Sequence, residues 1–129
     1  MVHLEQKRIW SVIFITGGNY PPKEFIHENL TTVESQSIYD FLRVLEKIKY
    51  PREFPRTKHY SHNGTPLYQV TVGNFRIYIH VDSSNKRLVV SYICRKSGNK
   101  AKKQDKDRAV AAIQDYIVEN REDRDGQEI

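Results

Sequence analysis

The sequence predicts a single α+β domain with an antiparallel, mixed-edge sheet of about four strands, helices on one face, and the order β-α-β-β-β-α. Three observations lead to this fold. The chain has 129 residues, which is the size of one domain. Two apolar stripes with helical spacing flank a block of alternating residues. Within that block, Gly73-Asn74 separates two alternating runs, as in a tight hairpin.

The first 30 residues are expected to form an N-terminal strand and an extended loop. Residues 8–16 are rich in β-branched and aromatic side chains and are apolar on both sides, which favours a strand covered on both faces. Gly17-Gly18 ends this run. Residues 19–30 contain Pro21-Pro22 and no clear period, so we interpret them as a loop with at most one short helical turn.

A helix is expected to follow, over residues 32–50. Thr31 and Glu34 have the spacing of a capping box, in which each side chain satisfies a free N–H at the helix start. Pro51 ends the helix near Tyr50. One apolar stripe runs along it, formed by Ile38, Phe41, Leu42, Leu45 and Ile48.

The central hairpin pairs residues 67–72 with residues 75–82, after a polar connection over 51–66. Val72 opposite Phe75 sorts the side chains into two faces. The face expected to pack on the helix holds Tyr68, Val70, Val72, Phe75, Ile77, Ile79 and Val81. The opposite, mixed face holds Leu67, Gln69, Thr71, Arg76, Tyr78, His80 and Asp82.

A third hairpin strand and a last helix complete the fold. Pairing of Asp82 with Arg87 sends Leu88, Val90, Tyr92 and Cys94 to the helix-facing side, and Val89, Ser91, Ile93 and Arg95 to the mixed face. The last helix is capped by Asp105 or Asp107 and carries the stripe Ala109, Val110, Ala112, Ile113, Tyr116 and Ile117. Residues 121–129 are expected to be a frayed acidic tail.

The charge is unevenly distributed along the chain. Lys and Arg number 21 against 16 Asp and Glu, a net charge of +5, and the pI is near 9.3. Residues 95–106 hold six cations and one acid, whereas residues 119–129 hold five acids and two arginines. Such a basic domain favours a nucleic-acid partner. No signal-peptide core or bilayer-length apolar run is present, so we expect a cytoplasmic protein without a membrane partner.

Few residues of the sequence belong to a known catalytic, nucleotide-binding or metal-binding motif. Neither GxGxxG nor a P-loop occurs, and His59, His62 and His80 have the spacing of no common zinc site, so we expect no metal and no cofactor. The single cysteine, Cys94, excludes an internal disulfide and is expected to be an inert buried thiol.

Arg76 is the most informative side chain, because it points away from the predicted helix. One interpretation is an exposed strand arginine paired with an acid. The other is an anion-binding guanidinium, joined by Arg95, Lys96 and Lys100, with Tyr78 as a ring on which a base stacks. Lys102 and Lys103 are either a solvated helix entry or part of a phosphate-contacting loop.

Residues 67–82 resemble the central hairpin of the RelE/ParE superfamily of toxins, with an aromatic-led strand, a Gly-containing turn and the segment Phe75-Arg76-Ile77. Residues 89–100 resemble the strand and basic loop of its HigB-like branch, and Lys58 resembles a lysine upstream of the hairpin. The likeness covers roughly residues 38–117. The first 30 residues match less well, since the family usually starts with a strand and goes quickly into helices.

The resemblance implies a RelE-like fold and a toxin of a type II toxin–antitoxin pair. Its activity would be ribosome-dependent mRNA cleavage by 2′-hydroxyl attack on the scissile phosphate, without a metal or small-molecule cofactor. The implied partners are mRNA, the ribosome and a cognate antitoxin. Arg76 matches the arginine that contacts the phosphate; Arg95 and Lys96 match cations at the strand end, and Lys100 a cation of the loop.

The sequence departs from the family at the outward positions of the first hairpin strand. RelE has lysines there that help to activate the 2′-hydroxyl, whereas this chain has Gln69 and Thr71. The general base is therefore unassigned, with His80 and Lys58 as candidates. Two alternatives stay open: a ParE-like toxin that inhibits DNA gyrase without nuclease activity, and a non-toxic, basic RNA-binding protein of the same fold.

Overall fold

The computed structural model describes residues 7–127, with side chains to residue 120, and shows one small α+β domain. Helices α1 (Pro22–Asn29) and α2 (Thr32–Glu46) follow strand β1 (Ser11–Phe14), and a short 3-10 helix (Pro51–Glu53) comes next. Four strands then lead to the long C-terminal helix α3 (Lys103–Gln127). These strands are β2 (Thr57–His62), β3 (Thr65–Val72), β4 (Phe75–Asp82) and β5 (Arg87–Arg95).

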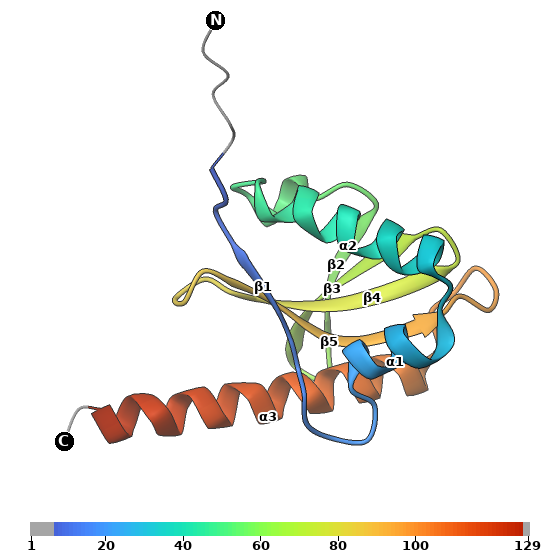
Figure 1. Cartoon of the computed structure of the whole chain (residues 1–129). Coiled ribbons are helices and arrows are strands. Elements are labelled where there is room, and N and C mark those ends of the chain that lie inside the picture. The colour runs from blue at the N-terminus through green and yellow to red at the C-terminus, as the bar shows by residue number, and fades with distance from the viewer. Residues whose placement is uncertain (1–6, 128–129) are drawn as a thin grey trace, which may run out of the picture.

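The sheet has five strands in the order β1-β5-β4-β3-β2 (Figure 1). Strand β1 runs parallel to β5, and the other neighbours are antiparallel, so the mixed edge is confirmed. The predicted count of about four strands and the order β-α-β-β-β-α are wrong, because β2 and α1 are additional elements. Within the described residues, no helix is both long and apolar enough to cross a bilayer.

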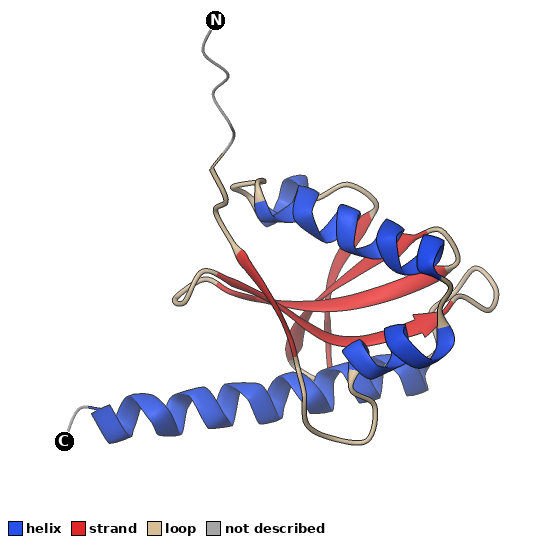
Figure 2. Ribbon diagram, viewed as in Figure 1, coloured by secondary structure: helices blue, strands red, loops and turns tan. Residues whose placement is uncertain are grey.

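Helices cover both faces of the sheet, not one as predicted (Figure 2). The first core lies between the sheet and α1 and α2, and includes Ile26, Ile38, Leu45 and Ile77. The second core lies between the opposite face and α3, and includes Leu67, Tyr78 and Ile113. The mixed face thus carries enough apolar surface to bind a helix of its own.

Helices α1 and α2 begin as the local sequence favours. Pro22 lies in the first turn of α1, where its missing N–H costs nothing, so these residues are a helix and not the expected loop. The capping box of α2 is present: Thr31 Oγ1 accepts from Glu34 N at 3.1 Å, and Glu34 Oε1 accepts from Thr31 N at 3.0 Å. Helix α2 ends at Glu46, before Tyr50, and the Glu46 carbonyl accepts from two backbone N–H groups at the entry to β1.

Strand β2 occupies part of the stretch expected to be a polar connection. Its sequence, Thr-Lys-His-Tyr-Ser-His, lacks the apolar alternation that marks a strand, because β2 is an edge strand with much of its surface exposed. The turn to β3 is made by Asn63 and Gly64, both with positive φ (51° and 78°). Asn-Gly is the preferred pair for such a hairpin turn.

The central hairpin has the predicted register, with Val72 opposite Phe75 and Tyr68 opposite Ile79. The β4–β5 pairing is also as predicted from Asp82–Arg87 to Ile79–Val90, but Tyr78 then pairs with Tyr92, which leaves Ser91 as an extra residue in a bulge. Beyond it the prediction is wrong: Tyr92 and Cys94 belong to the second core, and Ile93 to the first.

Helix α3 begins at Lys103, so Asp105 and Asp107 lie inside its first turns and neither is its cap. Ala109, Val110 and Ile113 of the predicted stripe are buried in the second core. The helix continues to Gln127, although residues 121–129 were expected to fray; residues 128–129 lie outside the described part of the chain.

Candidate functional site

Arg76 is buried on the face of the sheet that packs against α3, where the loop before this helix contacts its guanidinium, and only 2% of the residue is exposed. Its Nη2 donates to the carbonyl oxygen of Gly98 at 3.0 Å, and its buried Nε has no hydrogen-bond partner in the described residues. The side chain lies on the predicted face, but α3 covers that face. No carboxylate of the described residues pairs with Arg76, so the interpretation as an exposed, acid-paired strand arginine is wrong as well.

Polar and aromatic side chains surround Arg76, and we call this group the Arg76 cluster: Tyr60, Gln69, Arg76, Tyr78, Tyr92, Cys94 and Asp105. Tyr60 Oη donates to Gln69 Oε1 at 2.5 Å. Tyr92 Oη donates to Asp105 Oδ1 at 3.2 Å and accepts from Arg108 Nη1 at 3.1 Å. The cluster combines residues of β2, β3, β4, β5 and α3, so it exists only in the folded chain.

Burial keeps the phenols of Tyr60 and Tyr78 and the thiol of Cys94 protonated at neutral pH. It raises the pKa of Tyr60 to about 12 and that of Cys94 to about 12, and it raises the pKa of Tyr78 as well. The Cys94 thiol is thus neutral, in agreement with the prediction of an inert buried thiol. The charged donor Arg76 makes the cluster suited to binding an anion.

Five lysines belong to the strands, loop and helix start near Arg76, and we call them the basic rim: Lys58, Lys96, Lys100, Lys102 and Lys106. Lys58 is exposed on β2 and pairs with Gln69, on the Arg76 side of the sheet. The next three are exposed in the loop between β5 and α3. The Lys106 ammonium lies 5.1 Å from the centre of the Tyr60 ring. The predicted contact residue Lys103 is exposed and bonded to Asp107.

Two of the predicted site residues, Arg95 and His80, lie away from Arg76. Arg95 lies on the opposite side of the sheet, 5.0 Å over the Phe75 ring, with a hydrogen bond to Asn29 O (3.1 Å) and an ion pair to Glu34 (3.6 Å). His80 is four residues from Arg76 along β4, a separation of about 13 Å. Its ring packs against Tyr116, and burial lowers its pKa.

Tyr78 is fully buried, so its ring offers no surface on which a base stacks. Its hydroxyl has no hydrogen-bond partner in the described residues. Tyr78→Phe should therefore raise the free energy of unfolding by about 1 kcal/mol, because it removes an unsatisfied buried group. Tyr92→Phe is the matched control and should lower it by about 1 kcal/mol, since that hydroxyl makes two hydrogen bonds. Equal losses in urea unfolding of both variants would contradict this account.

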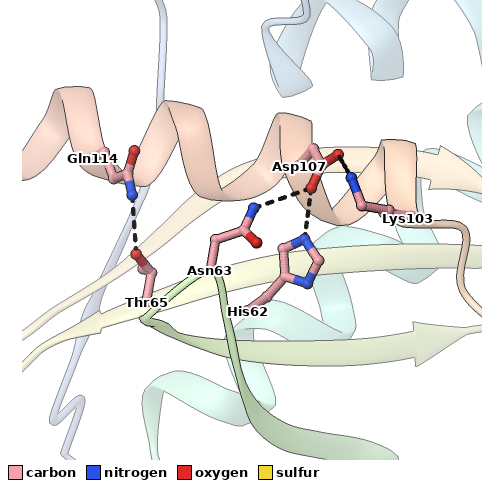
Figure 3. Close-up of polar contacts among 6 residues, drawn as sticks. All are labelled: His62, Asn63, Thr65, Lys103, Asp107 and Gln114. Carbon is pink, nitrogen blue, oxygen red and sulfur yellow. Dashed lines mark hydrogen bonds and ion pairs between the residues drawn. The ribbon is translucent and has the colours of Figure 1, made fainter.

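Polar contacts of Asp107 join the β2–β3 turn to α3 (Figure 3), and we call them the Asp107 clasp. One oxygen of Asp107 lies 2.7 Å from His62 Nε2 and accepts from Asn63 Nδ2 at 3.2 Å, and the other accepts from Lys103 Nζ at 2.9 Å. About two helical turns further along α3, Gln114 Nε2 donates to Thr65 Oγ1 at 3.3 Å. These contacts hold the start of α3 over the Arg76 cluster.

The clasp should make stability depend on pH in acid. The hydrogen bonds from His62 and Lys103 lower the pKa of Asp107 from 3.8 to about 2. The folded state thus binds this proton less readily than the unfolded state, so the contribution is present above pH 3.8 and is lost as the pH falls to 2. Asp107→Asn should show a smaller loss of unfolding free energy between pH 5 and pH 2 than the wild type. Asp115→Asn, exposed on the same helix, should keep the wild-type dependence.

Two grooves lie away from Arg76. One, of about 550 Å³, separates the Gly17-Gly18 loop from α3 and holds Arg108, whose guanidinium is 4.0 Å over the Tyr20 ring. The other, of about 570 Å³, lies between α2 and the β3–β4 turn. Neither is lined by a residue of the basic rim.

The sequence-based prediction missed Tyr60 and His62, both on β2, and the roles of Asp105 and Asp107. Asn63-Gly64 was the available signal, because that pair predicts a hairpin and hence a strand before it. Nothing in the local sequence shows that Asp105 and Asp107 contact β5 and the β2–β3 turn, since these contacts are long-range.

No protein-family model matches the sequence, and no curated protein matches it either. We therefore infer function from the residues of the site and from the resemblance of the hairpin.

Proposed function

We propose that this protein is a ribosome-dependent mRNA endonuclease of the RelE/ParE type, closest to the HigB-like branch, and the toxin of a type II toxin–antitoxin pair. The observation that carries the proposal is the basic rim around Arg76. One buried guanidinium whose Nε has no partner among the described residues, together with lysines at the same end of the sheet, four of them exposed, is suited to bind the phosphates of RNA.

The fold is compatible with the resemblance. The family usually starts with a strand and goes quickly into helices, and here α1 and α2 follow β1 directly. The lysines that resemble those of the HigB-like loop are exposed between β5 and α3.

In the proposed reaction, the 2′-oxygen of a ribose attacks the adjacent phosphorus. A bond from the 2′-oxygen to phosphorus forms, and the bond to the 5′-oxygen breaks. The proton of the 2′-hydroxyl passes to a base, and the departing 5′-oxygen takes up a proton from the solvent to become a hydroxyl. Arg76 and the lysines of the basic rim stabilise the charge on the phosphate oxygens. Both candidate bases lie on the Arg76 side of the sheet: Lys58 is exposed on β2, and His80 is about 13 Å from Arg76 along β4.

A second candidate, a non-toxic RNA-binding protein of the same fold, is favoured by one observation. Arg76 is buried, and Gln69, at a position where RelE has a lysine, is bonded to Tyr60 inside the cluster. Such a protein would bind RNA through the basic rim with a steep salt dependence and leave it uncleaved.

Induced expression in a bacterial host tests the proposal. The wild-type chain should arrest growth, with translated mRNA cut within codons. Purified protein should leave the supercoiling activity of DNA gyrase unchanged. Inhibition of gyrase without mRNA cleavage would favour the ParE-like alternative, and normal growth with intact mRNA would contradict the toxin proposal.

A further inference from the structure

We propose that the loop of residues 97–102 masks Arg76. In the masked state a backbone carbonyl of the loop, that of Gly98, accepts a hydrogen bond from the guanidinium. When a phosphate of RNA replaces this carbonyl as the acceptor, the loop moves aside. This inference concerns regulation of the site and rests on the proposed function for the identity of the phosphate. We call these residues the masking loop.

Arg76 is incompletely satisfied in the masked state. An arginine carries five N–H donors, and in the described residues this one has a single hydrogen bond, to a neutral carbonyl. Among the described residues its buried Nε has no partner, and no ion pair compensates its charge. Since a buried charge without full hydrogen bonding is costly, the masked state is only weakly preferred. A phosphate accepts two N–H groups of a guanidinium and brings the opposite charge, so it is the better acceptor.

The masking loop is weakly held between two firm ends. At one end, Lys96 N donates to Asn74 O at 2.6 Å; at the other, the Asp107 clasp fixes α3 to the β2–β3 turn. Between them, residues 97–100 are exposed, and among the described contacts the bond from Arg76 to Gly98 is the one hydrogen bond that ties them to the sheet. The loop can therefore move without unfolding α3.

The masking loop also carries positive charges that attract the phosphates of RNA. Lys100 and Lys102 are exposed in it, the Lys106 ammonium lies over the Tyr60 ring, and Lys58 is two residues before Tyr60 on β2. RNA that approaches the basic rim thus meets the loop lysines before it reaches Arg76. Binding of phosphates to these lysines and the release of the Gly98 carbonyl are expected to favour each other.

Gly98 allows a selective test, because its φ of +94° is strained for any residue with a side chain, while no heavy atom lies within 4 Å of an added Cβ. Gly98→Val therefore disfavours the masked backbone through its φ, while its Cβ meets no neighbouring atom. Gly18→Val is the matched control: Gly18 has a φ of +85° and open space, but lies in the β1–α1 loop.

Two readouts need no ligand: the rate of Cys94 alkylation by iodoacetamide, and the hydrogen-exchange rate of Arg76 Nε–H. Both groups are buried in the wild type. In Gly98→Val both rates should rise about tenfold, because the strain at a left-handed φ raises the population of the unmasked state by about that factor. In Gly18→Val they should stay at the wild-type values. Exchange of the Ile79 amide, in the central strand β4, monitors global unfolding and should change by a similar factor in Gly98→Val and Gly18→Val, because both variants strain a left-handed glycine. Unchanged rates in Gly98→Val, or the same rise in both variants, would overturn the mask.

Affinity for a short single-stranded RNA separates the mask from the proposed function. Gly98→Val should bind the RNA more tightly than the wild type by a similar factor of about ten, and adding Arg76→Gln should remove the gain. If Cys94 and Arg76 become accessible while RNA affinity stays at the wild-type value, the masking loop is supported and RNA binding by Arg76 is contradicted. If the gain survives Arg76→Gln, the phosphate does not replace the Gly98 carbonyl on Arg76, and the inference fails.

Discussion

Arg76→Gln should abolish the growth arrest that the wild-type chain causes on induction. The glutamine amide ends at the position of the Arg76 Nε, so it loses the Nη2 bond to the Gly98 carbonyl as well as the charge and the paired N–H groups that bind a phosphate. Loss of a charged group that stabilises the transition state typically lowers a rate by about 100-fold or more. Cleaved mRNA, measured by primer extension, should fall by the same factor.

Two controls make this result interpretable. Arg43→Ala removes one positive charge from the exposed face of α2 and should arrest growth as the wild type does. The melting temperature of Arg76→Gln should be at or above the wild-type value, since the variant removes a buried charge that lacks an ion pair. A folded Arg76→Gln protein that arrests growth fully would show that Arg76 has no part in cleavage.

Ile113→Asp should lower the free energy of unfolding by about 4 kcal/mol, the largest stability effect we expect. Ile113 is fully buried in the second core with Leu67 and Tyr78. The substitution loses the burial of a large aliphatic side chain and places a carboxylate in apolar surroundings. Urea unfolding followed by circular dichroism measures the change.

Val118→Asp is the matched control on the same helix, because Val118 is 54% exposed. It should change the free energy of unfolding by no more than about 0.5 kcal/mol. A similar small change for Ile113→Asp would show that α3 does not pack on the sheet, and the covered position of Arg76 would then be wrong.

The central hairpin could be predicted residue by residue, because its alternation is strict and a one-residue slip would send Val70 and Ile77 to the wrong face. The pairing of β4 with β5 was predictable only as far as Val90. Ser91 introduces a bulge that no local pattern marks, and it turns Tyr92 and Cys94 towards α3.

The candidate site was predictable in part for the same reason. The side of the sheet that holds Arg76 follows from alternation, but its burial does not, because it depends on a helix that begins 27 residues later in the chain. Arg95 was placed with Arg76 on the assumption of an unbroken register, and the bulge moves it to the Phe75 side.

Cleavage of a defined mRNA on purified ribosomes tests the central claim most directly. The wild-type protein should cut within the codon in the ribosomal A site and leave a 2′,3′-cyclic phosphate on one fragment and a 5′-hydroxyl on the other. Without ribosomes, or with Arg76→Gln, the mRNA should stay intact. An mRNA that remains uncut on ribosomes saturated with folded wild-type protein would contradict the assignment of this chain as an mRNA endonuclease.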